Sequence, residues 1–198
     1  MKYFIIFFAF IFCGFAGGNN KPSKMPSPTL KTITKLSTLI KATYDEAYLS
    51  QLSKLIDQYS AKYKVDPILV VAIFAQESRF DLHAQNCQNG LSRAGHPAYV
   101  CTDFGISQIS YSNIKKRKLS VKKLTTDLEY SIENGIKILA ETKQYQKKEP
   151  NTYWTRYNTS NKYYRKLYQQ LVCRYYVKGN LCHNGKDHIK YINGQESI

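Results

Sequence analysis

The sequence contains few histidine, tryptophan and acidic residues. Its 198 residues include four His, one Trp and 14 Asp or Glu, against 29 Lys or Arg. No cluster of carboxylates and no pair of histidines has the spacing that would hold the metal ions of a nuclease, so the sequence argues against that class. It also contains no internal repeat, and its length predicts one domain, or one domain with a tail.

Long apolar runs are scarce as well, and one of the two lies at the N-terminus. It follows Lys2 and ends in small residues, which is the layout of a secretory signal peptide. Because Gly14-Phe15-Ala16 forms a small-x-small cleavage site, we expect residues 1–16 to be a signal peptide and the protein to be exported, as a periplasmic or secreted protein. Phe12 precedes Cys13 where a lipoprotein signal has a small residue, which disfavours a lipid anchor. An uncleaved membrane anchor is the alternative, because the run is near the lower length limit for a membrane span.

The excess of basic residues gives a formal net charge of +15. Such a charge favours an anionic partner: nucleic acid, a membrane surface or an acidic wall polymer. Export makes nucleic acid the least suitable of these, so we expect no nucleic-acid partner. The lysine runs Lys115–Lys118 and Lys122–Lys123 are equally consistent with solvated helix faces.

Four cysteines remain when the expected signal peptide is removed: Cys87, Cys101, Cys173 and Cys182. An even number in an exported chain suggests disulfides, and four cysteines allow three pairings. Proximity in the sequence favours Cys87–Cys101 and Cys173–Cys182. The competing interpretation is metal ligation by Cys182 with His183 and His188, but that spacing matches no structural zinc pattern, so we expect no metal.

The second apolar run, Ile68–Ala75, predicts a buried helix. Asp66 is placed to cap its start, and Pro67 suits the first helical position, where its missing N–H costs nothing. The run is too short to span a membrane and has no polar face, so the helix should be buried on most sides. Glu77 then ends it. Desolvation and the helix dipole should both raise the pKa of Glu77, which would make it a proton donor, although an ion pair with Arg79 is the simpler alternative.

The remaining pattern predicts a mainly α-helical domain over residues 44–176. Residues 17–43 should form a flexible leader, with a loosely packed helix as the alternative for residues 29–43, and residues 177–198 a polar tail. Between Phe80 and Asp103 the sequence is rich in turn residues and flanked by cysteines, which favours a small irregular, disulfide-stapled lobe with a short β-hairpin. Further helices are expected from Tyr44 to about Tyr63, from a Thr126 cap to about Tyr145, over Asn151–Tyr157 and around Tyr164–Tyr175.

Four separated segments resemble motifs of one family, the bacterial lytic transglycosylases with the soluble-lytic-transglycosylase catalytic domain (glycoside hydrolase family 23). A-Q-E-S-R-F at Ala75–Phe80 resembles their Glu-Ser-x-Phe motif, and F-G-I-S-Q-I at Phe104–Ile109 is similar to their Gly-x-x-Gln-(Ile/Val) motif. R-Y-N-T-S at Arg156–Ser160 resembles Tyr-Asn-x-Gly, with Ser160 in place of the glycine, and Tyr163–Leu167 resembles Tyr-x-x-Lys-Val. The segments occur in the family's order and span roughly Tyr44 to Cys173.

The resemblance implies a goose-type lysozyme-like helical fold that acts on peptidoglycan glycan strands. In the family a single carboxylate, here Glu77, protonates the oxygen of the β-1,4 bond between N-acetylmuramic acid (MurNAc) and N-acetylglucosamine (GlcNAc). It then accepts the proton of the muramic acid 6-hydroxyl, which leaves a 1,6-anhydro end. The resemblance implies no cofactor and no metal, and we expect a monomer.

The same motifs suggest how other residues contribute to the site. Ser78 would orient the acid by a hydrogen bond, and Gly105 would let the backbone pass close to the sugar. Gln108 would bond acetamido or peptide groups, while Tyr157 and Asn158 would form the wall that faces Glu77.

Asp103 leaves a second mechanism open. Its segment, Thr102–Ile109, also resembles the strand of animal c-type lysozymes that carries their second catalytic carboxylate. If Asp103 faces the cleft, a muramidase that hydrolyses the same bond with two carboxylates is the alternative.

Two further interpretations differ from an enzyme that degrades the wall on its own. One is an accessory wall enzyme that serves a secretion or conjugation machine through a partner. The other is a non-catalytic protein that binds the wall or a membrane through its cationic surface.

Overall fold

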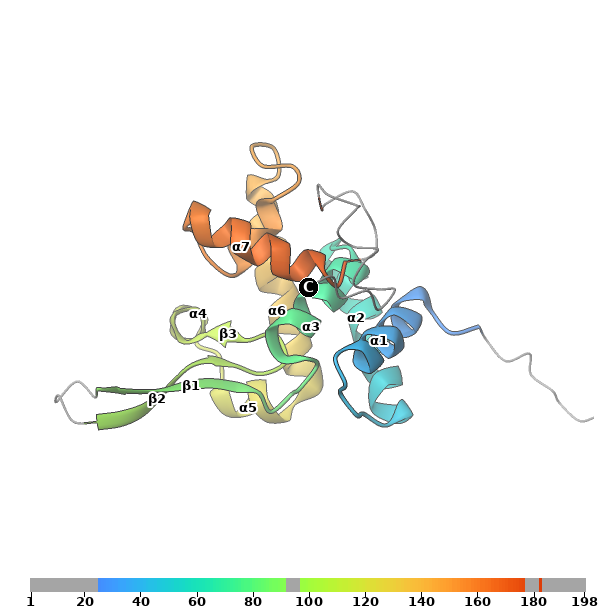
Figure 1. The fold of residues 1–198 in the computed structure, drawn as a ribbon, viewed down its shortest axis with the longest axis horizontal. Helices are drawn as coiled ribbons and strands as arrows, with labels where there is room; N and C mark the ends of the chain where they lie inside the picture. Colours follow the sequence, from blue (N-terminus) through green and yellow to red (C-terminus); the bar gives the residue numbers. More distant parts are fainter. Residues whose placement is uncertain (1–24, 92–96, 177–181, 183–198) are drawn as a thin grey trace, which may run out of the picture.

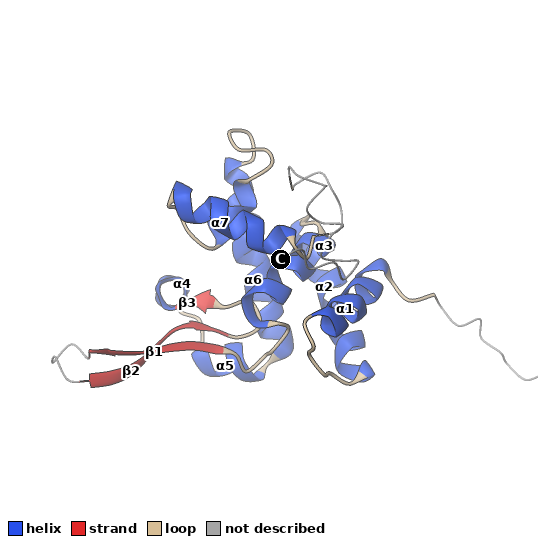
Figure 2. Cartoon of the chain, viewed as in Figure 1, coloured by secondary structure: helices blue, strands red, loops and turns tan. Residues whose placement is uncertain are grey.

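The computed structural model describes residues 25–91, 97–176 and 182. In this part the chain is mainly helical, with a small sheet at one side that ends in a long projecting hairpin (Figures 1 and 2). The predicted signal peptide and all of the predicted tail except Cys182 lie outside the described residues. Within the described ranges, no helix combines the length and the hydropathy needed to cross a membrane.

The elements follow one another as helices, then strands, then helices. The α-helices are α1 (Pro28–Leu39), α2 (Glu46–Tyr63), α3 (Pro67–Ser78), α4 (Tyr111–Arg117), α5 (Val121–Thr126), α6 (Leu128–Glu141) and α7 (Lys162–Cys173). Two short 3-10 helices are η1 (Thr142–Tyr145) and η2 (Tyr153–Tyr157). The strands are β1 (Gln85–Leu91), β2 (Pro97–Phe104) and β3 (Ile109–Ser110), which form one antiparallel sheet in the order β1-β2-β3.

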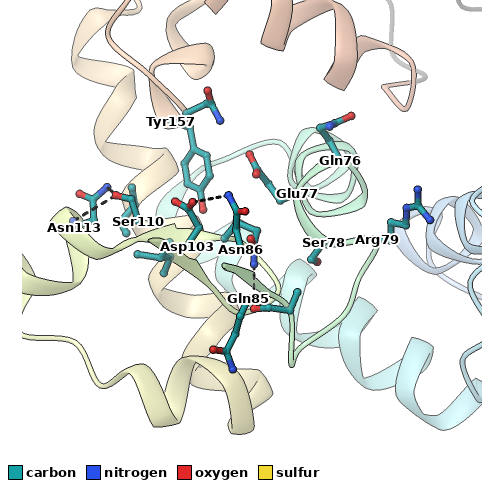
Figure 3. Close-up of a pocket in the computed structure, with 15 residues that line it drawn as sticks. Gln76, Glu77, Ser78, Arg79, Gln85, Asn86, Asp103, Ser110, Asn113 and Tyr157 are labelled. Atoms are coloured by element: carbon teal, nitrogen blue, oxygen red, sulfur yellow. Dashed lines mark hydrogen bonds between the residues drawn. The ribbon is translucent and has the colours of Figure 1, made fainter. Parts of the chain in front are cut away.

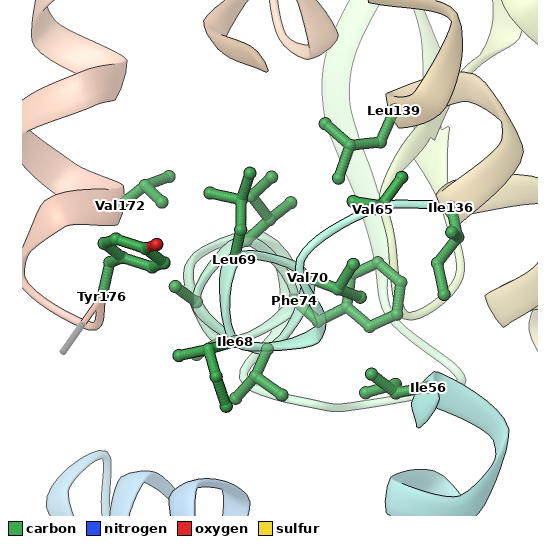
Figure 4. Close-up of a cluster of buried hydrophobic side chains, with 14 of the residues drawn as sticks. Ile56, Val65, Ile68, Leu69, Val70, Phe74, Ile136, Leu139, Val172 and Tyr176 are labelled. Atoms are coloured by element: carbon green, nitrogen blue, oxygen red, sulfur yellow. The ribbon is translucent and has the colours of Figure 1, made fainter. Parts of the chain in front are cut away.

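Helix α3 is the centre of the core, as its sequence predicts. All residues of Ile68–Ala75 are buried, the Asp66 side chain accepts a hydrogen bond from the Ile68 N–H, and Pro67 occupies the first turn. Figure 4 shows side chains from three other helices around it: Ile56 of α2, Ile136 and Leu139 of α6, and Val172 of α7. A helix with no polar face therefore has neighbours on nearly every side.

Helix α1 corrects the prediction of a flexible leader for residues 28–39, where the structure contains the helix given as the alternative, while residues 17–24 lie outside the described residues. Ser27 caps the helix, and Ile33 and Leu36, spaced three residues apart, are 0% and 3% exposed in the common core. The Thr29 hydroxyl also donates to Asp57 Oδ1 of α2, at 2.5 Å. The many Thr and Lys residues of this segment conceal a narrow apolar stripe, so composition alone understates its packing.

Two predicted helix limits also need correction. The N-cap of α6 is Asp127, whose side chain accepts from the Tyr130 N–H, and Thr126 instead ends α5. Helix α6 stops at Glu141 and continues as the 3-10 turn η1, while the short helix predicted near residues 151–157 is the 3-10 helix η2. A 3-10 turn has no distinct sequence signal, because it shares the residue preferences of an α-helix end.

The lobe between α3 and α4 is the expected hairpin, and both predicted disulfides are present. Cys87 and Cys101 are paired across β1 and β2, and Cys173 at the end of α7 is bonded to Cys182. A register shift follows Asn86, which lies opposite Asp103 at the end of the hairpin nearest the core. The hairpin thus brings Asn86 and Asp103 toward the end of α3, where both line the same cavity as Glu77.

Candidate active site

A cavity of about 540 Å³ opens where α3 ends. Its walls come from the last turn of α3, the base of the hairpin, the segment from β3 into α4, and the residues at the end of η2 (Figure 3). Six of the seven predicted site residues line it: Glu77, Ser78, Asp103, Gln108, Tyr157 and Asn158. The seventh, Gly105, is not among the lining residues.

Glu77 lies in the last turn of α3, and its carboxyl is held by a tyrosine. The hydroxyl of Tyr168, a residue of α7 that is 4% exposed, donates to Glu77 Oε1 at 2.5 Å. In the described part of the chain no salt bridge includes Glu77, so the alternative of an ion pair with Arg79 is not what the structure contains.

The environment of Glu77 keeps the proton on its carboxyl. Burial raises the pKa of Glu77 to about 7, the negative charge of Asp103 acts in the same direction, and the hydrogen bond from Tyr168 opposes both. Desolvation is the cause expected for a carboxyl beside an apolar helix. Near neutral pH such a group both donates and accepts protons readily.

Asp103 faces the same cavity from β2. Its Oδ2 accepts from Asn86 Nδ2 at 3.1 Å and from Thr102 Oγ1 at 2.7 Å. Figure 3 shows the Glu77 side chain directed from α3 toward Tyr157 and Asp103. The cavity therefore contains two carboxyl groups with different surroundings, one held by a buried tyrosine and one by two polar neighbours at the surface.

Tyr157 forms the wall between these two groups. Its hydroxyl donates to the Ser107 carbonyl oxygen at 2.6 Å, and its pKa is raised by burial and then by the Glu77 charge. Glu149 pairs with both Arg156, beside Tyr157, and Arg165 of α7, which ties the wall to the helix that carries Tyr168. These bonds hold the pKa of Glu149 at about 2.

The side chains of Ser78 and Gln108 both donate hydrogen bonds within the protein. The Ser78 hydroxyl does not reach Glu77; it donates to the Ile106 carbonyl oxygen at 2.7 Å and fixes the end of α3 to the turn after β2. Gln108 Nε2 donates to the carbonyl oxygens of Ala84 and Gly105, which leaves its amide oxygen to meet a ligand.

Packing alone requires a glycine at position 105. It has a φ of 76°, and a Cβ at this position would lie 2.6 Å from Ser131 Oγ and closer still to the Leu124 carbonyl oxygen. Ser160, which replaces the motif glycine, is not among the described residues with positive φ, so its backbone needs no glycine.

Two site residues were missed by the sequence interpretation. Tyr168 has the helical spacing of a core residue and is buried as one, so only its contact with Glu77 reveals its role. Asn86 is turn-like in sequence, and its position opposite Asp103 follows from strand register. Among the described residues, no group of three or more His, Cys, Asp or Glu side chains is arranged to hold a metal ion.

Comparison with known families gives a match that covers the part of the chain that contains the cavity. Residues 54–170 match the family model described as "Transglycosylase SLT domain". No curated protein matches the chain. The matched range runs from α2 into α7 and includes Glu77, Asp103, Tyr157 and Tyr168, together with the whole hairpin.

We predict that Glu77→Gln stabilises the protein and that the gain increases with pH. The pKa of Glu77 is raised from 4.5 to about 7, so ionisation opposes folding: the cost is absent below pH 4.5 and complete above about pH 7. Denaturant unfolding at about pH 8 should show a gain of roughly 1–3 kcal/mol, with little gain near pH 4. An equal gain at both pH values would mean that glutamine only packs better.

We also predict that Tyr168→Phe raises the pKa of Glu77 above about 7, because the hydroxyl bond that lowers it is lost while burial remains. The measurement is a 13C NMR titration of the Glu77 carboxyl, assigned by comparison with Glu77→Gln. Tyr59→Phe is the matched control, since its hydroxyl bonds Glu129, away from the cavity. A lower or unchanged pKa in Tyr168→Phe would contradict the assigned contact.

Proposed function

The chain belongs to the transglycosylase SLT domain family, and from that premise we propose that Glu77 is the single acid and base of a lytic transglycosylase. Membership of the family makes the protein a peptidoglycan-cleaving enzyme that breaks glycosidic bonds. The observation that supports Glu77 in this role is its half-buried carboxyl at the cavity, with a pKa raised to about 7.

The proposed reaction has two proton transfers through the same carboxyl. Protonated Glu77 donates to the glycosidic oxygen as the bond between MurNAc C1 and the GlcNAc O4 breaks, and GlcNAc leaves with a free 4-hydroxyl. The resulting carboxylate then accepts the proton of the MurNAc 6-hydroxyl while that oxygen attacks C1. The product is a 1,6-anhydro end, no water is consumed, and Glu77 returns to its protonated state.

Other residues of the cavity suit this sequence of steps. Tyr168 stabilises the carboxylate after the first transfer and fixes its orientation. Asp103, held by Asn86 and Thr102, would stabilise positive charge that develops at C1. Tyr157, Asn158 and the amide oxygen of Gln108 remain as the wall that meets the sugars and their acetamido groups.

A second candidate, hydrolysis by a muramidase, is favoured by one observation. Asp103 shares the cavity with Glu77 and acts on its pKa, as a second carboxylate in a glycosidase would. In that mechanism Asp103 would be needed for turnover, whereas in the transglycosylase it only assists. The two candidates therefore differ both in their product and in their response to loss of Asp103.

We predict that the purified protein releases 1,6-anhydro-MurNAc ends from peptidoglycan, as mass spectrometry of the digest would show. Glu77→Gln should lose activity by at least about a thousandfold, because no proton donor remains. Asp103→Asn should retain anhydro products at a rate lowered by roughly ten- to a hundredfold. Reducing ends that disappear in Asp103→Asn would instead establish the muramidase, and activity that survives in Glu77→Gln would refute the assignment of the acid.

The expected partner is the glycan strand itself, reached outside the cytoplasm. Peptidoglycan as substrate implies periplasmic or extracellular action. We further propose a monomer that binds no nucleic acid, with a secretion or conjugation machine as the alternative setting. The wall carries peptide carboxylates, and the α4–α5 segment, whose Asn113 lines the cavity, exposes several lysines, Lys115, Lys116 and Lys122 among them.

We predict that the exposed lysines of the α4–α5 segment increase wall binding at low ionic strength. Replacing Lys115, Lys116 and Lys122 by Gln should weaken binding to isolated sacculi on the order of tenfold at low salt, with little change at high salt. The charge-matched control replaces Lys31, Lys35 and Lys54, which are exposed on α1 and α2. Equal losses in both triple variants would show that net charge alone matters.

A further inference from the structure

Helix α3 ends in an unusual turn immediately after Glu77 and Ser78. Arg79 and Phe80 are consecutive and both left-handed, with φ of 58° and 70°. Residues other than glycine pay a steric penalty in this region, and bulky residues rarely adopt it. Phe80 is also 0% exposed, so the turn places its ring in the core. Something must hold two strained residues in succession.

Backbone hydrogen bonds hold part of this turn, and one of them closes it, from the Asp81 N–H to the Ser78 carbonyl oxygen at 3.2 Å. The Arg79 N–H donates to the Ala75 carbonyl oxygen at 3.2 Å, and the Phe80 N–H donates to that of Phe74 at 3.4 Å. These bonds satisfy the last carbonyls of the helix in the usual way for a left-handed end. Among the described residues, no backbone N–H donates to the carbonyl oxygens of Arg79 and Phe80 themselves.

Two tyrosines supply donors to these oxygens. The Tyr44 hydroxyl donates to the Arg79 carbonyl oxygen at 2.9 Å, and the Tyr48 hydroxyl donates to the Phe80 carbonyl oxygen at 2.7 Å. The two rings are stacked, with centroids 5.1 Å apart. Burial raises the pKa of both phenols, which keeps them protonated as donors.

The position of these tyrosines in the chain is informative. Tyr44 precedes α2 and Tyr48 lies in its first turn, where the Tyr48 N–H donates to the Asp45 cap at 2.6 Å. Both residues precede the matched range, which begins at residue 54. A segment outside the recognised domain thus bonds the turn that follows the catalytic residue.

We propose that Tyr44 and Tyr48 are positioning residues for Glu77, because their hydroxyls hold the left-handed Arg79–Phe80 turn and so fix the last turn of α3, which carries Glu77. Ser78 fixes the opposite side of the same turn to Ile106. This inference rests on the proposed role of Glu77 as the acid.

A physical consequence distinguishes positioning from general support of the fold. If the turn relaxes, water reaches the Glu77 carboxyl and the burial that raises its pKa decreases. The other titratable groups that face Glu77 are Asp103 of β2, Tyr157 of η2 and Tyr168 of α7, and none of them is altered by changes at Tyr44 or Tyr48. The pKa of Glu77 should therefore fall, in the direction opposite to that expected for Tyr168→Phe.

The experiment compares Tyr44→Phe, Tyr48→Phe and the double variant with Tyr176→Phe. Tyr176→Phe is the matched control, because the Tyr176 hydroxyl bonds Asp66 Oδ2 at 2.9 Å, at the start of the same helix. Two quantities are measured on each folded full chain: the pKa of Glu77 by 13C NMR titration, and kcat and KM on a soluble glycan of defined length. Tyr44→Phe removes a bond at the surface and is the mildest change, so it serves if the others unfold.

The double variant should lower the pKa of Glu77 by roughly half a unit or more. Its kcat should fall about tenfold with KM nearly unchanged, because the acid is misplaced while the sugar-binding wall is intact. Tyr176→Phe should change neither quantity. An unchanged pKa in the double variant, or an equal fall in Tyr176→Phe, would overturn the inference.

The titration also separates this inference from the proposed function. If Glu77→Gln kept its activity, the assignment of the acid would fail, yet the pKa of Glu77 would still report whether the tyrosines hold the turn. If the tyrosine variants left that pKa unchanged while Glu77→Gln abolished cleavage, only the positioning role would be lost.

Discussion

The structure depends on the free-energy cost of placing a carboxyl at the end of a helix that has no solvent-exposed face. Helix α3 is buried along Ile68–Ala75, so whatever follows its last apolar residue meets a dry environment on the core side and the cavity on the other. Glu77 occupies that boundary. Burial disfavours its charge, and a single hydrogen bond from Tyr168 favours it. The chemistry follows from this near balance, because a carboxyl wholly in water would ionise and one wholly in the core would never release its proton.

Maintaining that balance requires rigid surroundings, and the fold supplies them with polar bonds rather than more apolar contact. Ser78 fixes the end of α3 to Ile106, and Glu149 pairs with Arg156 and Arg165 to hold η2 against α7. Ser78 belongs to α3 and Arg156 to η2, two elements that line the cavity. The contribution of these bonds to stability offsets part of the cost of ionising a buried carboxyl, and groups arranged for reactivity commonly lower the stability of a fold.

The sequence predicts this centre well because its signals are local. Asp66 and Pro67 define the start of α3, an unbroken apolar run defines its burial, and the abrupt return of polarity identifies Glu77. The disulfides were equally accessible, since each joins two cysteines that are close in the sequence. Tyr168 was not, because a buried tyrosine at helical spacing looks the same whether its hydroxyl bonds a catalytic acid or a backbone carbonyl. Contacts that join residues 91 positions apart leave no local pattern.

The structural unit that carries the acid is larger than the segment that the family comparison recognises. Helix α1 places Ile33 in the same hydrophobic cluster as α3, although it precedes residue 54 and its composition resembles a linker. Tyr44 and Tyr48 follow it and bond the turn beyond Glu77. A motif comparison detects the residues that face the substrate, because their chemistry restricts their identity. A segment that packs against α3 and bonds the turn after it needs only an apolar stripe and a hydroxyl. Many different sequences can therefore hold α3 in place.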